Sequence, residues 1–187
     1  EAGMMFCSDD MSLNEPVQHA QGIGRQMLAT HCSASRRWLG ANFIGRRGDA
    51  YTAVDIADHF RAVITAVGLP FWWVLERGPW DCDFINGVAV DDAWSDRDGF
   101  RMGALGSIIN IRRKFTPQGK TIEGAFNYFQ ARMAGHSVSV GRKRGRHEFV
   151  SKMLERAKAG NEEALQFIWS ADEAMECIWA RMQEMNA

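Results

Sequence analysis

The chain has 187 residues, of which 46% are hydrophobic and 24% charged, and its formal net charge is −1. This composition is typical of one globular domain with a sizeable core, and it excludes a disordered or collagen-like chain. Because no run of about 18 apolar residues is present, the sequence also predicts no membrane span.

The N-terminal third gives weak local signals. Residues 1–16 lack hydrophobic periodicity, so we expect a loose N-terminal arm. An α/β core is predicted over residues 17–115, beginning with a helix over residues 17–30 and a strand over residues 38–44. The glycine-flanked arginine pair at residues 45–48 indicates a loop, which is either a solvated turn or a phosphate contact.

The stretch from Thr52 to Val90 carries the clearest pattern. Thr52 and Asp55 have capping-box spacing, and Gly68 is placed to end the helix that follows them. One apolar stripe runs along that helix at Ile56, Phe60, Val63, Ile64 and Val67. His59 lies between stripe residues and is predicted to be a partly buried structural histidine.

Two strands are predicted after this helix. Residues 71–75 (FWWVL) are apolar on both faces, which indicates a strand in the middle of a covered sheet. Residues 81–90 form the second strand, with Asn86-Gly87 either as a hairpin turn or as a tight turn before a helix. A further extended piece is expected over residues 107–111.

The C-terminal portion, residues 116–187, is predicted to be mainly helical and packed on the core. Ser170 and Glu173 form a second capping-box match at the start of the last helix. The buried face of that helix is predicted to comprise Met175, Ile178, Trp179 and Met182. The predicted fold class is therefore α/β (α+β), a small mixed sheet with covering helices followed by a helical C-terminal portion.

Searches for specific motifs set limits on function. No dinucleotide-binding glycine fingerprint, zinc-protease helix or nucleophile elbow is present. Gly119-Lys120-Thr121 matches the end of a phosphate-binding loop, but Lys114 stands where its first glycine is needed. The four cysteines include no Cys-x-x-Cys pair, which indicates free thiols in a reducing cytosol.

An acidic cluster offers the first candidate site. Residues 55–100 carry nine acidic and three basic side chains, with six aspartates at the end of the predicted strand pair. Clustered carboxylates can hold Mg²⁺ for phosphodiester hydrolysis. Asp81, Asp83 and Asp91 are the candidate catalytic residues, and Asp81 and Asp83 are the candidate metal ligands. The alternative is a solvated acidic rim.

A basic segment offers the second candidate site. Residues 101–157 carry twelve basic and three acidic side chains, a net charge of +9. The residues predicted to bind nucleic-acid phosphates are Arg142, Lys143, Arg144, Arg146, Arg112 and Arg113. Gly141 and Gly145 make the first four a flexible loop, which suits a phosphate backbone better than base edges. The alternative is that these charges are neutralised within the fold or merely solvated.

The order of predicted elements over residues 38–95 resembles the ParB/sulfiredoxin family. The resemblance is carried by a helix stopped at residues 68–70 (GLP), an apolar strand, a hairpin, and a strand ending in Asn86-Gly87 before a helix. Gly87 matches the glycine of that family's phosphate-binding box. Residues 88–90 (VAV) stand where the family carries its catalytic triplet.

The resemblance implies a function. The size and the helical C-terminal half are similar to the plasmid-borne fertility inhibition proteins of that family, which implies DNase and ATPase activity, with Mg²⁺ and ATP as cofactors. DNA or a nucleoprotein would then be the partner, and the bacterial cytoplasm or the periphery of the inner membrane the location.

Two other functions stay open. A non-enzymatic inhibitor would bind a host or phage protein through an aromatic, Met-rich helical surface of Trp169, Met175, Trp179 and Met182. A redox protein would use Cys32 or Cys82, but neither thiol has an evident resolving partner.

Overall fold

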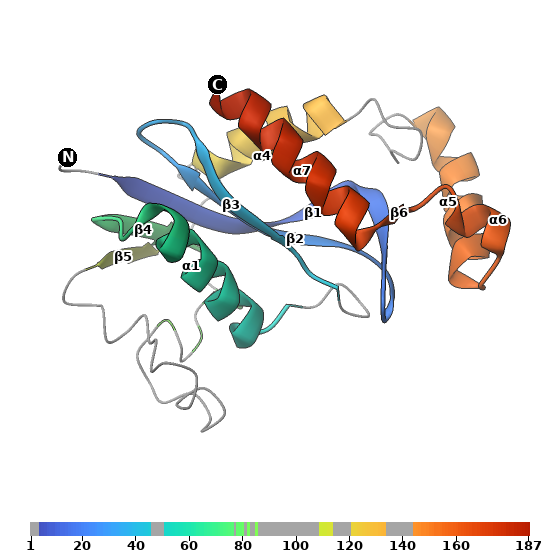
Figure 1. Ribbon diagram of the computed structural model, residues 1–187, viewed down its shortest axis with the longest axis horizontal. Helices are drawn as coiled ribbons and strands as arrows, with labels where there is room; N and C mark the ends of the chain where they lie inside the picture. Colours follow the sequence, from blue (N-terminus) through green and yellow to red (C-terminus); the bar gives the residue numbers. More distant parts are fainter. Residues whose placement is uncertain are drawn as a thin grey trace.

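The computed structural model describes residues 4–45, 51–76, 78–80, 82, 85, 109–113, 121–133 and 144–187. A mixed sheet is covered by helices on both faces, and the C-terminal portion is helical (Figure 1). The predicted α/β class is therefore confirmed. Among the helices of these ranges, none combines the length and the hydropathy that crossing a bilayer requires.

Five strands of the sheet lie in the order β3-β2-β1-β4-β5. The first three pair antiparallel, whereas β4 is parallel to β1 and β5 is parallel to β4. A two-residue strand, β6, pairs with the far end of β1. The strands are β1 (Met5–His19), β2 (Gly22–Cys32), β3 (Trp38–Phe43), β4 (Trp72–Leu75), β5 (Asn110–Arg113) and β6 (Trp169–Ser170).

Two of the N-terminal predictions, the loose arm and the first helix, are wrong. The expected loose arm and the helix over residues 17–30 are instead β1 and β2, a long antiparallel hairpin with its turn at residues 20–21; Gly22, which starts β2, has φ of 137°. Most of β1 is buried on both faces, because helices cover the sheet on each side. A strand buried in this way shows no alternation of apolar and polar residues, which explains why periodicity did not reveal it.

The helix over Thr52 to Val67 is confirmed as α1 (Ala53–Val67). The Thr52 backbone N–H donates to Asp55 Oδ2 at 2.7 Å, which is one half of the predicted capping box. Gly68 ends the helix with φ of 84°, a conformation that favours glycine. Predicted strands over residues 38–44 and 71–75 are confirmed as β3 and β4, and the extended piece over residues 107–111 overlaps β5.

Helix α1 packs closely on β3 at Gly40. An added Cβ there would lie 2.6 Å from Val63 Cγ2, a distance that real Cβ atoms do not adopt. We expect Gly40→Ala to lower the free energy of unfolding by about 1–3 kcal/mol, because the helix must shift away from the sheet. Urea denaturation measures this. The control is Gly124→Ala, where an added Cβ meets no heavy atom within 4 Å; equal destabilisation by both variants would contradict the packing argument.

Helices α4 (Thr121–Met133) and α7 (Ala171–Asn186) cover the face of the sheet opposite α1 (Figure 1). The apolar residues of α4 that stand in helical phase are all buried: Ile122, Phe126, Phe129 and Met133. On α7, Ile178 and Met182 are buried as predicted. Trp179 was assigned to the same buried face and is instead 40% exposed, because it lies on the outer side of α7.

The other helices of the described residues, α5 (Arg144–Lys158) and α6 (Glu162–Leu165), pack on each other through a small apolar cluster. Ile23 at the start of β2 packs against that cluster and ties it to the sheet. The basic loop prediction is wrong for Arg144 and Arg146, because α5 begins at Arg144 and the first turn of a helix tolerates Gly145. The predicted strand over residues 81–90 lies outside the described residues, apart from Cys82 and Ile85.

Candidate metal centre

Three carboxylates converge where β4 ends alongside the N-terminal half of β1. They belong to Asp9 and Asp10 of β1 and to Glu76, which directly follows β4, and one oxygen atom of each lies within 4.8 Å of the others. The sheet dictates this arrangement. Because β1 and β4 are parallel and Cys7 pairs with Val74, a step of two residues along both strands brings Asp9 level with Glu76.

Hydrogen bonds fix the orientation of these carboxylates. Tyr51 Oη donates to Asp10 Oδ1 at 2.7 Å, and Gln26 Nε2 donates to Asp10 Oδ2 at 2.5 Å. The Asp10 backbone N–H donates to Asp9 Oδ1 at 3.1 Å. A carboxylate oxygen accepts more than one partner, so each of these atoms can still bind a cation. Ligands held by such neighbours keep their direction when a metal binds.

Tyr51 remains a hydrogen-bond donor over the whole physiological range. Burial raises the pKa of its hydroxyl well above the usual value, and the hydrogen bond to Asp10 raises that pKa further. The ring packs near Trp80, with 6.0 Å between ring centroids, and the Trp80 side chain is fully buried. Tyr51 therefore packs beside Trp80 and orients the Asp10 carboxylate through its hydrogen bond.

The donor set suits a hard divalent cation. Mg²⁺ prefers carboxylate oxygens and keeps several of its waters, so it needs a site that is open on one side. Asp9 is 5% exposed, whereas Asp10 and Glu76 are partly exposed. The cluster therefore has a buried floor and a side that faces solvent. This arrangement can hold a cation and leave coordination positions for water or a phosphoryl oxygen.

Strand β5 brings two of the sequence-predicted arginines to this edge of the sheet. Arg112 pairs with Val74, and Arg113 pairs with Leu75, the residue before Glu76. The end of β5 thus lies next to the carboxylates in the backbone pairing. Arg112 and Arg113 were predicted to bind phosphate, and the topology places their backbone one strand away from the acidic cluster.

The other sequence-predicted site residues are not brought to the cluster by the described structure. Asp81, Asp83, Asp91, Arg142 and Lys143 all lie outside the described residues. Arg144 and Arg146 belong to the first turn of α5. That helix packs against α6 and the start of β2.

Sequence reasoning missed Asp9, Asp10 and Glu76. One signal was available, because an acidic residue directly follows the most apolar strand of the chain, and the carboxyl end of a parallel strand is where ligands bind in open α/β sheets. The aspartate pair was hidden, since its strand was interpreted as a loose arm. Only the pairing of β1 with β4 brings the three residues together.

The comparisons with known proteins give no family. No model of a protein family matches the sequence, and no curated protein matches it. Among solved structures, the chain is similar to the simian T-cell lymphotropic virus intasome in complex with PP2A regulatory subunit B56 gamma, studied by cryo-EM. The identity is 11%, the TM-score is 0.41, and the match covers 69% of this chain and 39% of that chain. A likeness at this level carries no argument about function.

Proposed function

We propose that this chain holds Mg²⁺ at Asp9, Asp10 and Glu76 and hydrolyses phosphodiester or phosphoanhydride bonds in a nucleic acid or nucleotide. The observation that carries the proposal is the convergence of these three carboxylates at one edge of the sheet. When bound, Mg²⁺ supplies a Lewis acid for the phosphoryl oxygen and lowers the pKa of a coordinated water. DNA in a bacterial plasmid or phage setting is the substrate that the resemblance to the ParB/sulfiredoxin family implies.

Each group of the chain has a separate task in this scheme. Asp9, Asp10 and Glu76 hold the cation, and Tyr51 fixes the direction of the Asp10 carboxylate. The segment of residues 101–157, with a net charge of +9, attracts the phosphate backbone. Asp81, Asp83 and Asp91, which lie outside the described residues, stay candidates for further ligands.

The direct test is a nuclease and ATPase assay with Mg²⁺ and with EDTA. Cleavage of DNA or release of phosphate that requires Mg²⁺ is the expected result. The proposed hydrolase function would be contradicted if neither activity is seen over a range of Mg²⁺ and Mn²⁺ concentrations, on both single-stranded and double-stranded DNA.

We expect the basic segment to set the salt dependence of DNA binding. Changing Arg142, Lys143, Arg144 and Arg146 together to Ala should weaken binding and reduce the slope of log affinity against log salt by about 3–4, because four phosphate contacts are lost. Fluorescence anisotropy at several salt concentrations measures this. The control changes the exposed Arg61 of α1 and Lys158 at the end of α5, both outside residues 101–157, to Ala. If the slope of log affinity against log salt is unaltered in the fourfold variant, these four residues do not contact the DNA.

A second function, an inhibitor that binds a protein partner, is favoured by one feature of α7. Trp179 is 40% exposed, and with Met175 it borders an open groove on the outer side of the helix. Acidic residues Asp172 and Glu176 line the same groove. Met182 was predicted to be part of this surface and is only 1% exposed, so it belongs to the core. The hydrolysis assay separates the two functions, since an inhibitor shows no Mg²⁺-dependent activity.

A further inference from the structure

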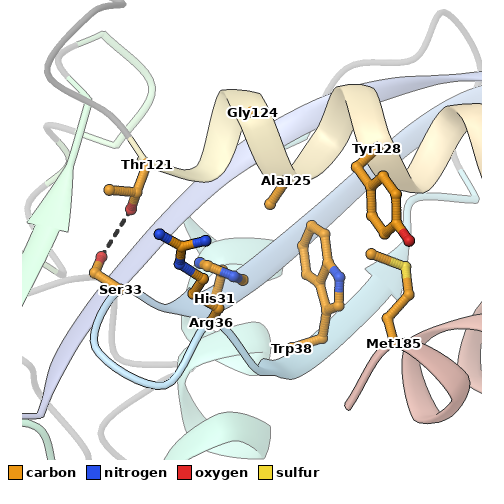
Figure 2. Close-up of a pocket in the computed structure, with 9 residues that line it drawn as sticks. All are labelled: His31, Ser33, Arg36, Trp38, Thr121, Gly124, Ala125, Tyr128 and Met185. Atoms are coloured by element: carbon orange, nitrogen blue, oxygen red, sulfur yellow. Dashed lines mark hydrogen bonds between the residues drawn. The ribbon is translucent and has the colours of Figure 1, made fainter. Parts of the chain in front are cut away.

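A pocket of about 520 Å³ lies under the first turns of α4, on the opposite side of the sheet from α1 (Figure 2). Its floor comes from the end of β2 and the start of β3, and the C-terminal end of α7 closes one side. The volume is within the range of small-molecule sites and exceeds the needs of an inorganic ion. None of its lining residues belongs to the carboxylate cluster at Asp9, Asp10 and Glu76.

Two buried polar atoms in the pocket lining have no hydrogen-bond partner among the described residues. They are Nδ1 of His31 and Nε1 of Trp38, whose side chains are 5% and 3% exposed. Leaving such an atom unsatisfied costs about 1–3 kcal/mol, so native proteins almost always give it a partner. Since no described protein group satisfies these two atoms, a molecule bound in the pocket can serve as the partner of both.

One of the two atoms is a hydrogen-bond donor and the other is an acceptor. The Trp38 indole N–H can only donate. Burial lowers the pKa of His31, which is therefore neutral at pH 7, and a hydrogen bond to the Arg36 backbone partly offsets that shift. That bond uses the ring's single N–H, so Nδ1 of His31 offers a lone pair. A ligand must donate to His31 and accept from Trp38.

A cation and hydroxyl groups mark one end of the pocket. Figure 2 shows the Arg36 guanidinium directed toward the first turn of α4, beside the hydrogen-bonded pair of Ser33 Oγ and Thr121 Oγ1, which are 2.8 Å apart. Arg36 has φ of 59°, an unfavourable left-handed conformation for a residue with a side chain. Together with the positive end of the α4 dipole, these groups can attract an anion.

An exposed aromatic ring marks the other end. Tyr128 is 50% exposed and lies with Met185 on the side of Trp38 away from Arg36 (Figure 2). A planar heterocycle can stack on such a ring, and this contact is worth about 1–3 kcal/mol for a nucleic-acid base. The pocket thus offers an anion site, a hydrogen-bond acceptor, a donor and a stacking face in that order.

We propose that this pocket binds a nucleoside monophosphate. The phosphate lies at Arg36, Ser33 and Thr121, a sugar hydroxyl donates to His31 Nδ1, and the base accepts from Trp38 Nε1–H and stacks on Tyr128. This order matches the chemistry of the ligand from one end to the other. The site is separate from the carboxylate centre, so it stands whether or not the chain is a hydrolase.

The test is isothermal titration calorimetry of the full chain with the 5′-monophosphates of adenosine, guanosine, cytidine and uridine. We expect at least one to bind at micromolar to low millimolar concentration. Adenosine tests the aromatic end of the pocket alone, and inorganic phosphate tests the anion end alone. Each should bind at least tenfold more weakly than the best nucleotide. Two results would overturn the proposal. One is that inorganic phosphate binds as tightly as every nucleotide. The other is that no nucleotide binds at a concentration of about 10 mM, which corresponds to a very weak affinity.

Variants at Gly124 locate the binding site. A side chain added at Gly124 enters open space in the pocket, since no heavy atom lies within 4 Å of its Cβ position. Gly124→Trp should fill the pocket and abolish binding, whereas Gly124→Ala should retain it, and thermal unfolding confirms that both are folded. Arg36→Ala should weaken binding at least tenfold. Asp9→Asn should leave binding unchanged, so failure of the hydrolase and failure of this pocket are distinguishable. Nucleotide binding that survives Gly124→Trp overturns the assignment.

Discussion

Replacement of Asp9 by Asn is expected to lower Mg²⁺-dependent hydrolysis by about 100-fold or more while the fold stays intact. Asparagine has the shape of aspartate, and its Oδ1 can still accept the hydrogen bond from the Asp10 backbone N–H. The change removes one charge from a cluster of three carboxylates. Because loss of a residue that only orients a ligand costs about 10–100-fold in affinity or activity, loss of a ligand itself costs more.

Binding of the metal can be measured without any activity. A cation that binds only the folded chain raises the free energy of unfolding by about 2.7 kcal/mol at one hundred times its dissociation constant. We expect Mg²⁺ to raise the melting temperature of the unaltered chain and to have no such effect on Asp9→Asn. The matched control is Asp58→Asn, at an exposed position on α1. It should keep the full Mg²⁺ effect.

The same measurement decides between two locations of the centre. Asp81→Asn and Asp83→Asn test the residues that the sequence pointed to first. Loss of the Mg²⁺ effect in those variants, together with its retention in Asp9→Asn, would place the centre in the segment after β4. Loss of the Mg²⁺ effect in Asp9→Asn and in Glu76→Gln places the metal centre where β1 and β4 meet.

Features decided by neighbouring residues were predictable. The start and end of α1 depend on Thr52, Asp55 and Gly68, which all act within one helical turn of the helix ends. The buried stripe of α4 follows from helical spacing alone. Such signals are local, so no knowledge of the sheet was needed to interpret them.

The N-terminal hairpin and the carboxylate cluster depend on distant partners. Strand β1 lies in the middle of the sheet between β2 and β4, and this place requires β4, far along the chain, to pair with it in parallel. Parallel pairing leaves no turn signal in the sequence, since the connection includes a helix. Asp9 and Glu76 therefore become neighbours only in the fold.

His59 shows how a correct prediction can understate a role. Its side chain is fully buried, with Nδ1 2.6 Å from Asn42 Oδ1 and Nε2 2.7 Å from Thr30 Oγ1. Thr30 is hydrogen-bonded to Ser8, and Trp73 Nε1–H donates to Ser8 Oγ. Since the amide oxygen of Asn42 only accepts, Nδ1 carries the proton and Nε2 accepts from Thr30. The chain of bonds connects α1 with four strands of the sheet.

This network predicts that stability falls in mild acid. Burial lowers the pKa of His59 to about 3, whereas an unfolded histidine titrates near 6.5. Below pH 6.5 the unfolded chain takes up a proton that the folded chain does not, so the stability is full above pH 6.5 and falls as the pH decreases toward 3. One group contributes about 1.4 kcal/mol per pH unit, which gives about 2 kcal/mol between pH 6.5 and pH 5.

Urea denaturation at pH 7.5, 6.5, 5.5 and 5.0 measures this loss, and His59→Gln isolates its source. The variant should be less stable at pH 7.5 by about 1–3 kcal/mol, because Thr30 and Asn42 lose a fitted partner. Below pH 6.5 its free energy of unfolding should fall less steeply with decreasing pH, because it takes up about one proton fewer on unfolding. Some slope should persist, since burial also lowers the pKa of His31; the double variant with His31→Gln should lose that part too. If His59→Gln keeps the full slope of the unaltered chain, the proton uptake belongs to other groups, and the buried network does not make the fold sensitive to acid.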